Sequence, residues 1–397
     1  MHPELRARFN ADFTEARYAE LLRGANESER WPVDFRISET PIFLTPAFTT
    51  EVRQAAEGIV AQVRTAEFAG HAKSAIPPGL EVPGETPHPA FLQVDFAICE
   101  HNGRLVPRLI ELQGFPSLYG FQIFLLRCLR HAFPAIPADW HPFFGGVNEH
   151  TYMEMLRDVI VGDADPETVV MVEIEPESQN TRIDFVCTET LLGIATVSLT
   201  DVQRRGNDLF YQRDGRDVRI ERIYNRVIFD ELLRRPDLSF GFGFQHEINA
   251  RWVGHPNWYF RISKHSLPFL KTPHTSRAFF ADEFPSGEAV GDYALKPLYS
   301  FAGVGVDLEP TPEKLRALED PHAWILQEKV NYADFVPTPD GLRSKAELRM
   351  MFLWPEKGEP VLVNNLVRMS QGAMMGVKFN KNKTWVGSSI ALHASSF

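Results

Sequence analysis

Apolar and polar residues alternate most regularly over residues 91–98, which predicts a strand with one apolar and one polar face. The sequence His101-Asn-Gly-Arg104 that follows is typical of a hairpin turn, so residues 105–113 are predicted to return as the partner strand. Pro107 lies inside this second strand, where an edge position or a bulge tolerates proline. The first third of the chain therefore contains one long hairpin.

Helical spacing occurs on both sides of this hairpin. Over residues 49–68 apolar residues recur every three or four positions, and Thr49 can cap the start of the helix. Two further helices are predicted at 15–24 and 117–131, and a Pro- and Gly-rich loop is predicted at 76–89.

Strands and helices alternate through the rest of the chain. The apolar run 168–174 predicts a buried strand. The later predicted elements are a helix at 180–192, a strand at 195–199, a polar hairpin at 208–220, a strand at 222–226, a helix ending at 233, a helix at 264–270, and strands at 293–296, 324–329, 346–353 and 360–367. Because both kinds of element recur, the predicted fold class is α/β or α+β.

Composition narrows the class of protein. A chain of 397 residues has room for two or three domains, and a net charge of −11 argues against a general nucleic-acid binder. The three cysteines are widely spaced, which favours a reducing compartment, so we expect a cytoplasmic protein. Neither a signal peptide nor a membrane span is expected, because no long apolar run is present.

A lysine followed by a glycine-rich loop is the first candidate for binding phosphate. Lys296 ends a predicted strand, and the segment 300–305, Ser-Phe-Ala-Gly-Val-Gly, follows it. Glycines let backbone N–H groups approach an anion closely, and the lysine adds a positive charge. The order of residues fits neither Gly-x-x-x-x-Gly-Lys nor Gly-x-Gly-x-x-Gly. An ordinary turn after a strand explains the same residues.

Asp95, Glu111 and Gln113 carry oxygen atoms of the kind that Mg²⁺ prefers. Glu111 and Gln113 share a face of their strand, but Asp95 joins them only in one register of the hairpin. A two-residue turn would pair Asp95 with Ile110, whereas a three-residue loop ending in a bulge pairs Asp95 with Glu111 and Gln93 with Gln113. We predict the three-residue loop. A solvated hairpin is the alternative explanation of the polar face.

Two other segments contain candidate binding residues. The strand ending in Gln327-Glu-Lys-Val330 could present its backbone to an adenine edge, and Asp334 could bind ribose hydroxyls. A strand that ends at the surface is the alternative. Arg349 and Arg368 lie among apolar residues of two strands, which indicates either buried ion pairing or contact with phosphate.

Together these motifs resemble the ATP-grasp ligases. In that family two lysines, a glycine-rich loop, a Gln-Glu-x-Val hinge and an arginine strand form the nucleotide site, and Glu-x-Asn ends the metal site. Here Lys264 is similar to the upstream lysine, and Glu347-Leu-Arg349 is similar to the arginine strand. The Glu-x-Asn motif is expected near the C-terminus, but its counterpart, Glu111-Leu-Gln113, comes early. That order resembles the circularly permuted ATP-grasp proteins, including the glutathionylspermidine synthetase-like group.

The resemblance implies a circularly permuted ATP-grasp fold with a pre-ATP-grasp-like α/β middle domain. It implies an ATP-dependent ligase, with ATP and Mg²⁺ as cofactors, that joins a small carboxylate to an amine through an acyl phosphate. The implied units are an N-terminal helical region (1–84), a metal-binding hairpin part (85–150), a substrate domain (151–255) and nucleotide-binding lobes (256–397). The implied metal ligands are Asp95, Glu111 and Gln113, the catalytic residues are Arg349 and Arg368, and the ATP contacts are Lys264, Lys296, Ser300, Phe301, Ala302, Gly303, Gly305, Gln327, Glu328, Lys329, Val330 and Asp334.

Gln113 departs from the family pattern, which has Asn at this position. Its amide oxygen can still coordinate a metal, but the longer side chain displaces that oxygen. No amidase domain is recognised, so chemistry on spermidine is not implied. Two alternatives stay open: a kinase that phosphorylates a small molecule, and a nucleotide-binding protein without catalysis, which Gln113 favours. The two substrates and the oligomeric state also stay open.

Overall fold

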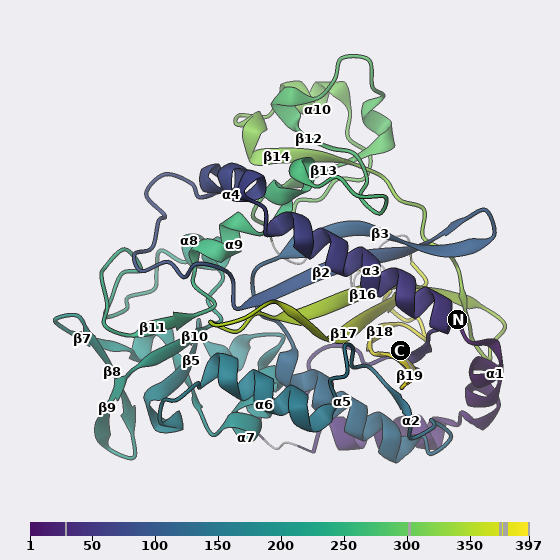
Figure 1. Cartoon of the computed structure of the whole chain (residues 1–397), viewed down its shortest axis with the longest axis horizontal. Coiled ribbons are helices and arrows are strands. Elements are labelled where there is room, and N and C mark those ends of the chain that lie inside the picture. Colours follow the sequence, from purple (N-terminus) through teal and green to yellow (C-terminus); the bar gives the residue numbers. More distant parts are fainter. Residues whose placement is uncertain (28–29, 301–302, 373–374, 376–379, 396–397) are drawn as a thin grey trace.

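A computed structural model describes residues 1–27, 30–300, 303–372, 375 and 380–395. The chain is a mixed α/β protein with several separate sheets (Figure 1). In Figure 1, α3 (Pro46–Val63) crosses the largest sheet, and α5 (Tyr119–Ala132), α6 (Glu149–Ile160) and α7 (Arg182–Leu192) run below it. The predicted α/β class is confirmed at this level.

The largest sheet has the strand order β18-β17-β16-β2-β3, with a short β15 paired to β16. Its neighbouring long strands are all antiparallel. Because β16 and β17 come some 250 residues after β2 in the chain, the centre of the sheet joins two distant segments. The strands are β2 (Phe91–His101), β3 (Arg104–Gln113), β15 (Val336–Pro337), β16 (Arg343–Leu353), β17 (Val361–Ser370) and β18 (Gly387–Ser389).

The hairpin between β2 and β3 has the predicted pairing but not the predicted loop. Asp95 pairs with Glu111 and Gln93 with Gln113. The turn, however, has two residues, Asn102 and Gly103, with φ of 51° and 72°, which are the positive values of a type I′ turn. The three-residue loop was therefore wrong. The extra residue is Ile110, which bulges where the register shifts between Asp95 and Phe96.

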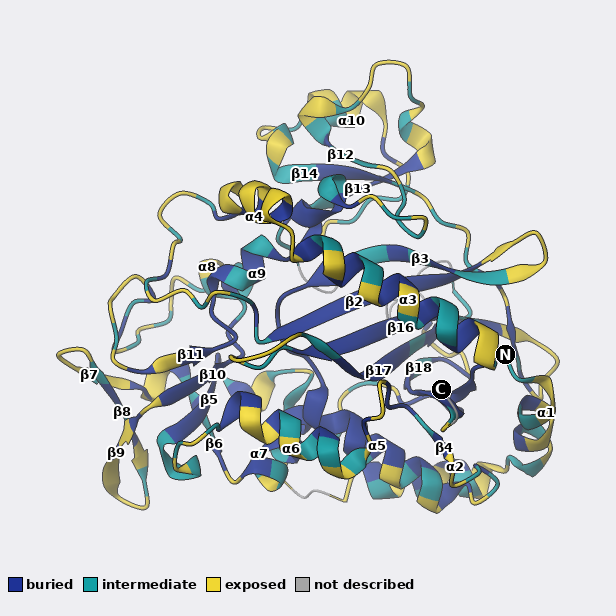
Figure 2. Cartoon of the chain, in the orientation of Figure 1, coloured by how far each residue is buried: buried dark blue, intermediate teal, exposed yellow. Residues whose placement is uncertain are grey.

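The two faces of this sheet are covered differently. One face packs its apolar residues, among them Val94, Leu348 and Met350, against Val52 and Ile59 of α3. The opposite face is apolar where it meets α5 and α6, and polar farther along the strands. Figure 2 shows the centre of the sheet buried and the outer face of α3 partly exposed. The polar part of the second face contains the candidate site.

Helix α3 begins earlier than predicted. Thr45, not Thr49, accepts a hydrogen bond from the N–H of Phe48, and Pro46 occupies the first helical position, where a missing N–H costs nothing. The helix ends at Val63, and a new Thr cap at Thr65 starts α4 (Ala66–Ala72), so the predicted single helix at 49–68 is two helices. Likewise, the predicted helix at 264–270 is a 3₁₀ helix, Lys264–Phe269, with Pro268 inside it.

The middle of the chain forms a parallel sheet of order β11-β10-β5-β6, from β5 (Val169–Glu173), β6 (Ala195–Ser198), β10 (Arg222–Asn225) and β11 (Arg251–Val253). A buried ion pair joins this sheet to α5. Asp184 of α7 accepts hydrogen bonds from the N–H groups of Leu118 (3.1 Å) and Phe121 (2.9 Å) at the start of α5. The same carboxylate pairs with Arg226 at 2.7 Å, just after β10. One side chain thus fixes three elements.

A small antiparallel sheet, order β12-β14-β13, lies at the top of Figure 1. Its own apolar cluster is built from Tyr293, Leu295 and Leu326. The strands are β12 (Ala278–Phe280), β13 (Tyr293–Pro297) and β14 (Trp324–Glu328). This sheet contributes Lys296 and Gln327 to the candidate site.

The remaining elements complete the surface of the molecule. None of the helices in the described residues is long and apolar enough to cross a membrane. These elements are α1 (Pro3–Asp12), α2 (Glu15–Ala25), α8 (Phe229–Leu233), α9 (Asn257–Arg261), α10 (Pro312–Arg316), the sheet β1-β19-β4 from β1 (Ile42–Phe43), β4 (Trp140–His141) and β19 (Ala391–Ala394), and the sheet of β7 (Gln203–Arg205), β8 (Asp208–Arg213) and β9 (Arg216–Ile220).

Candidate functional site

Asp95 is the centre of a row of charged side chains on the large sheet. It is fully buried and lies opposite Arg349 on one side and Glu111 on the other, in the middle of β2. The guanidinium of Arg349 donates to both carboxylate oxygens at 2.6 Å, and Arg368 donates to one of them at 2.7 Å. The buried ion pairing considered for these arginines is therefore present. Their role toward phosphate stays a prediction.

Arg368 also binds Glu347, which extends the row to β17. The two residues pair across β16 and β17, and their charged groups are 3.1 Å apart. Tyr332 donates a hydrogen bond of 2.6 Å to the other side of the Glu347 carboxylate. Burial raises the pKa of Glu347, and the positive charge of Arg368 opposes that shift. Glu347 is a member of the charged cluster that was not predicted as a site residue.

Glu111 contacts the first of the two predicted lysines. Lys264 lies 3.1 Å from the Glu111 carboxylate and also donates to the carbonyl of Ser300 at 2.6 Å. Burial alone would raise the pKa of Glu111. The charges of Lys264, Arg368, Arg349 and Lys296 outweigh burial and lower this pKa to about 2. Glu111 is therefore ionised across the physiological pH range.

Lys296 connects the small sheet to the bulge in β3. Its ammonium donates to Gln327 Oε1 at 2.6 Å and to the carbonyl of Ile110 at 3.4 Å. The amide group of Gln327 in turn donates to the carbonyl of Leu109 at 3.0 Å. A bulge turns backbone groups out of the regular ladder, and here two of them face the small sheet. Burial lowers the pKa of Lys296 to about 8, and Glu111 opposes this shift.

The glycine-rich loop returns to the strand from which it leaves. Leu295 and Asp307 exchange two backbone hydrogen bonds of 2.9 Å on either side of it. Gly303 and Gly305 both have positive φ, 73° and 76°, a region in which other residues are strained. The side-chain oxygen of Ser300 is buried without a hydrogen-bond partner among the described residues. Phe301 and Ala302 lie outside the described residues.

The predicted adenine and ribose contacts lie farther along the chain. Gln327 is buried in the cluster, as described above, but Glu328 pairs with Arg277 at 3.4 Å. The N–H of Lys329 donates to Asp292 at 3.0 Å, Val330 is half-buried, and Asp334 is exposed. Within the described part of the chain, no side-chain hydrogen bond or ion pair joins Glu328, Lys329 or Asp334 to the charged cluster. Their nucleotide roles stay predictions.

The predicted metal ligands differ in what surrounds them. The structure holds Asp95 between arginines and Glu111 against Lys264, while Gln113 Oε1 is buried with no donor in reach among the described residues. No group of three His, Cys, Asp or Glu residues in the described part of the chain is arranged to hold a metal. The predicted set has only two carboxylates, with an amide as its third member, so this absence does not bear on it, and it stays a prediction.

A second buried carboxylate, Glu173, lies at the end of β5. Its side chain accepts a hydrogen bond of 2.8 Å from the N–H of Ile174. Burial raises the pKa of Glu173 to about 8, and the charge of Arg226 opposes the shift only in part. Glu173 lies within the segment 168–174, which was predicted as a buried strand, but it was not among the predicted site residues. The apolar run before it was the available signal of burial.

Comparisons with known proteins identify a fold. No protein-family model and no curated protein matches the sequence. The structure resembles that of a glutathione synthetase-like effector from Globodera pallida, solved in its apo form, with a TM-score of 0.56. The match covers 89% of this chain and 94% of that chain, and the two sequences are 12% identical. The likeness shows a shared mixed α/β fold; it does not test the circular permutation.

Proposed function

We propose that this chain is an ATP-dependent carbon–nitrogen ligase that joins a small carboxylic acid to an amine. The observation that carries the proposal is the charged cluster between the large and small sheets. Four cationic side chains meet three carboxylates there, so the cluster has an excess of positive charge. These residues are Lys264, Lys296, Arg349, Arg368, Asp95, Glu111 and Glu347. The fold shared with a glutathione synthetase-like protein supports the same class of enzyme.

The cluster suits a magnesium–nucleotide complex because its ion pairs can exchange partners. Phosphate oxygens would replace carboxylates as partners of the lysines and arginines, and Mg²⁺ would replace those cations beside Asp95 and Glu111. The buried Oε1 of Gln113, which has no donor among the described residues, fits a third oxygen ligand. When bound, Mg²⁺ would neutralise charge on the phosphates.

The residues of the site would have different roles, according to where they lie. Lys264 and Lys296 would hold the phosphates nearer the nucleoside, and the Ser300–Gly305 loop would cover the others. Arg349 and Arg368 would stabilise negative charge on the phosphoryl group as it transfers. Gln327 to Val330 would contact adenine, and Asp334 the ribose.

The reaction that these groups support has two steps. A carboxylate oxygen of the acid attacks the γ-phosphorus of ATP, the bond to ADP breaks, and an acyl phosphate forms. The amine nitrogen then attacks the acyl carbon, phosphate leaves with the bridging oxygen, and the amine loses a proton to solvent. No protein nucleophile is required, because positioning and charge stabilisation carry the catalysis.

The proposal is tested by ADP release from Mg²⁺-ATP in the presence of pooled amino acids, peptides and polyamines. We expect ADP release that depends on an added acid and amine, and a loss of at least about 100-fold in Glu111→Gln. Glu57→Gln, on the exposed side of α3, is the matched control and should retain full activity. Circular dichroism checks that both variants fold.

Product mass separates this proposal from its alternatives. An amide has the mass of the acid and amine less one water, whereas a kinase product gains a phosphate group. ATP binding by calorimetry without any product would indicate a non-catalytic nucleotide-binding protein. Unchanged turnover in Glu111→Gln contradicts the placement of the site, and no ATP binding at all contradicts the ligase.

A further inference from the structure

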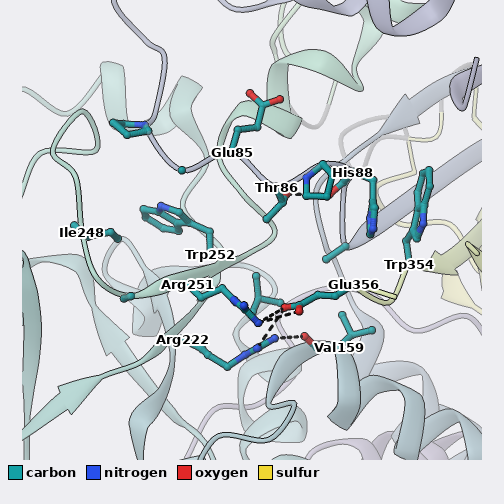
Figure 3. Close-up of a pocket in the computed structure, with 16 residues that line it drawn as sticks. Glu85, Thr86, His88, Val159, Arg222, Ile248, Arg251, Trp252, Trp354 and Glu356 are labelled. Carbon is teal, nitrogen blue, oxygen red and sulfur yellow. Dashed lines mark hydrogen bonds and ion pairs between the residues drawn. The ribbon is translucent and has the colours of Figure 1, made fainter. Parts of the chain in front are cut away.

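A cavity of about 360 Å³ is lined by residues that do not belong to the charged cluster, and Figure 3 shows them. It is bounded by the loop 83–88, the first residues of β10 and β11, and the turn that follows β16. Its volume lies within the range of pockets that bind small organic ligands, about 300–1,000 Å³. The cavity begins about five residues along β2 from Asp95, or roughly 16 Å at ~3.3 Å per residue. It is therefore a separate place in the fold.

The base of the cavity contains two arginines that share one carboxylate. Arg222 is buried and held rigidly, because its Nε and Nη2 donate to the carbonyls of Ile160 and Val159, both at 3.0 Å, at the end of α6. Its third nitrogen, Nη1, has only a long contact of 3.5 Å with Glu356. Arg251 donates to both oxygens of the same Glu356, at 2.8 and 2.9 Å.

Glu356 can be displaced from these arginines. Its side chain is 53% exposed and that of Arg251 is 57% exposed. Exposed ion pairs contribute little to stability, so the loss of this one costs the fold little. Glu356 thus shows which chemical group fits between the arginines, and a ligand carboxylate can take its place.

The walls of the cavity are aromatic. The rings of His88 and Trp354 are stacked, with centroids 4.4 Å apart and planes 10° from parallel. In Figure 3 this pair stands across the cavity from Trp252, with Arg222, Arg251 and Glu356 at the base. Aromatic walls favour a flat ring, and they contribute binding energy through apolar contact and stacking.

We propose that this cavity binds a small aromatic carboxylate, with the ring between the aromatic walls and the carboxylate on Arg222 and Arg251. The proposal is independent of the ligase function, because none of its residues belongs to the charged cluster. Arg222 Nη1 and the Arg251 guanidinium can each donate a charge-assisted hydrogen bond, so a carboxylate is favoured over the neutral amide of the same shape.

The test compares two probes of nearly equal shape, 2-naphthoate and 2-naphthamide, by calorimetry with the purified full chain. We expect 2-naphthoate to bind with a Kd below about 1 mM and 2-naphthamide at least about tenfold more weakly. Equal affinities of the two probes, or no binding of 2-naphthoate, would overturn the proposal.

Three variants locate the binding. Arg251→Gln, at an exposed side chain, should weaken 2-naphthoate about tenfold and leave 2-naphthamide unchanged. Trp354→Leu should weaken both probes alike. Glu356→Gln removes the competing carboxylate and should strengthen 2-naphthoate at least about threefold. Arg219→Gln, in an exposed pair with Asp208 on β8, is the control and should change nothing. Unchanged binding in Arg251→Gln, or weaker binding in Glu356→Gln, contradicts the assignment.

Discussion

Glu111 and Glu173 are two carboxylates that the fold withdraws from water, and their pKa values shift in opposite directions. The side chain of Glu111 is 25% exposed, and surrounding cations lower its pKa to about 2 despite burial. Glu173 is 3% exposed, and burial raises its pKa to about 8. The main difference between the two carboxylates is whether a cation pairs directly with them. Lys264 lies directly against Glu111, whereas Arg226, the cation near Glu173, is already paired with Asp184 at 2.7 Å.

The comparison shows that burial alone does not decide the charge of a carboxylate. A buried acid is ionised where cations face it, and it is neutral where the nearby cation is paired with another carboxylate. Perturbed carboxylates of both kinds occur at functional sites, so a shifted pKa alone does not identify the reactive one. The cations facing Glu111 keep it ionised, and its role toward phosphate and metal stays a proposal.

The largest expected effect comes from removing the cation near Glu173. Arg226→Met should lower the free energy of unfolding by about 3–5 kcal/mol, because it leaves the buried Asp184 without its ion-pair partner. It should also widen the pKa difference between the two glutamates. Urea unfolding at pH 7 measures the stability. Arg219→Met, in an exposed ion pair, is the control and should change the free energy of unfolding by less than about 0.5 kcal/mol.

A loss below about 1 kcal/mol in Arg226→Met would mean that Asp184 is held well enough by the N–H groups of Leu118 and Phe121 alone. That result would contradict the assignment of Arg226 as the stabilising ion-pair partner of Asp184.

The second effect is a pH dependence at Glu173. Its pKa is about 8 in the folded chain and 4.5 for an ordinary glutamate, so the folded state binds the extra proton between these two pH values. The free energy of unfolding should therefore fall as the pH rises from 5 to 8, by at most about 1.4 kcal/mol per pH unit from this group. Glu173→Gln should flatten that slope, which urea unfolding at successive pH values measures.

Glu177→Gln, an exposed neighbour, serves as the matched control and should keep the wild-type slope. Equal slopes in Glu173→Gln and the wild-type chain would show that Glu173 is ionised in the fold, and the contrast with Glu111 would disappear.

The smallest expected effect is the opposite dependence at Glu111. Its folded pKa of about 2 lies below the ordinary glutamate value of 4.5, so its contribution to stability is present above pH 4.5 and is lost as the pH falls toward 2. We expect the wild-type chain to lose about 1 kcal/mol more than Glu111→Gln between pH 5 and 3, allowing for partial exposure. Acid unfolding followed by circular dichroism measures this, with Glu57→Gln as control. Identical acid unfolding of Glu111→Gln and wild type would contradict the cation-rich surroundings.

Much of the hairpin could be predicted because strand side chains follow a period of two. Asp95, Glu111 and Gln113 have a common face only in one register, and that register is present. The extra residue that sets this register was predicted in the loop, but it is Ile110 in β3. Ile110 is one apolar residue among others, and nothing in the sequence distinguishes a bulge there from a regular strand. The Asn-Gly turn signal, by contrast, was correct for a two-residue loop.

The pairing of strands that lie far apart in the chain could not be predicted from the sequence. The partners Asp95 and Arg349 lie on strands separated by most of the chain, and cross-strand register between such segments has no local signal. The sequence offered ion pairing and phosphate contact as equal roles for the arginines, and only the assembled sheet shows their shared carboxylate. The Asp184–Arg226 pair could not be predicted either, because the helix and the strand meet only in the folded chain.

The single extra residue in β3 has a consequence for how such a site can arise. The turn at Asn102 and Gly103 is too tight to absorb a slip, so the strand takes up the extra residue as a bulge, and the side chains beyond it keep their faces. Deletion of Ile110 would leave Glu111 opposite Asp95 and Gln113 opposite Gln93, and would remove the carbonyl that accepts a hydrogen bond from Lys296. One codon gained or lost at this position therefore changes the contact between β3 and the small sheet, while the acidic pair beside Arg349 keeps its place.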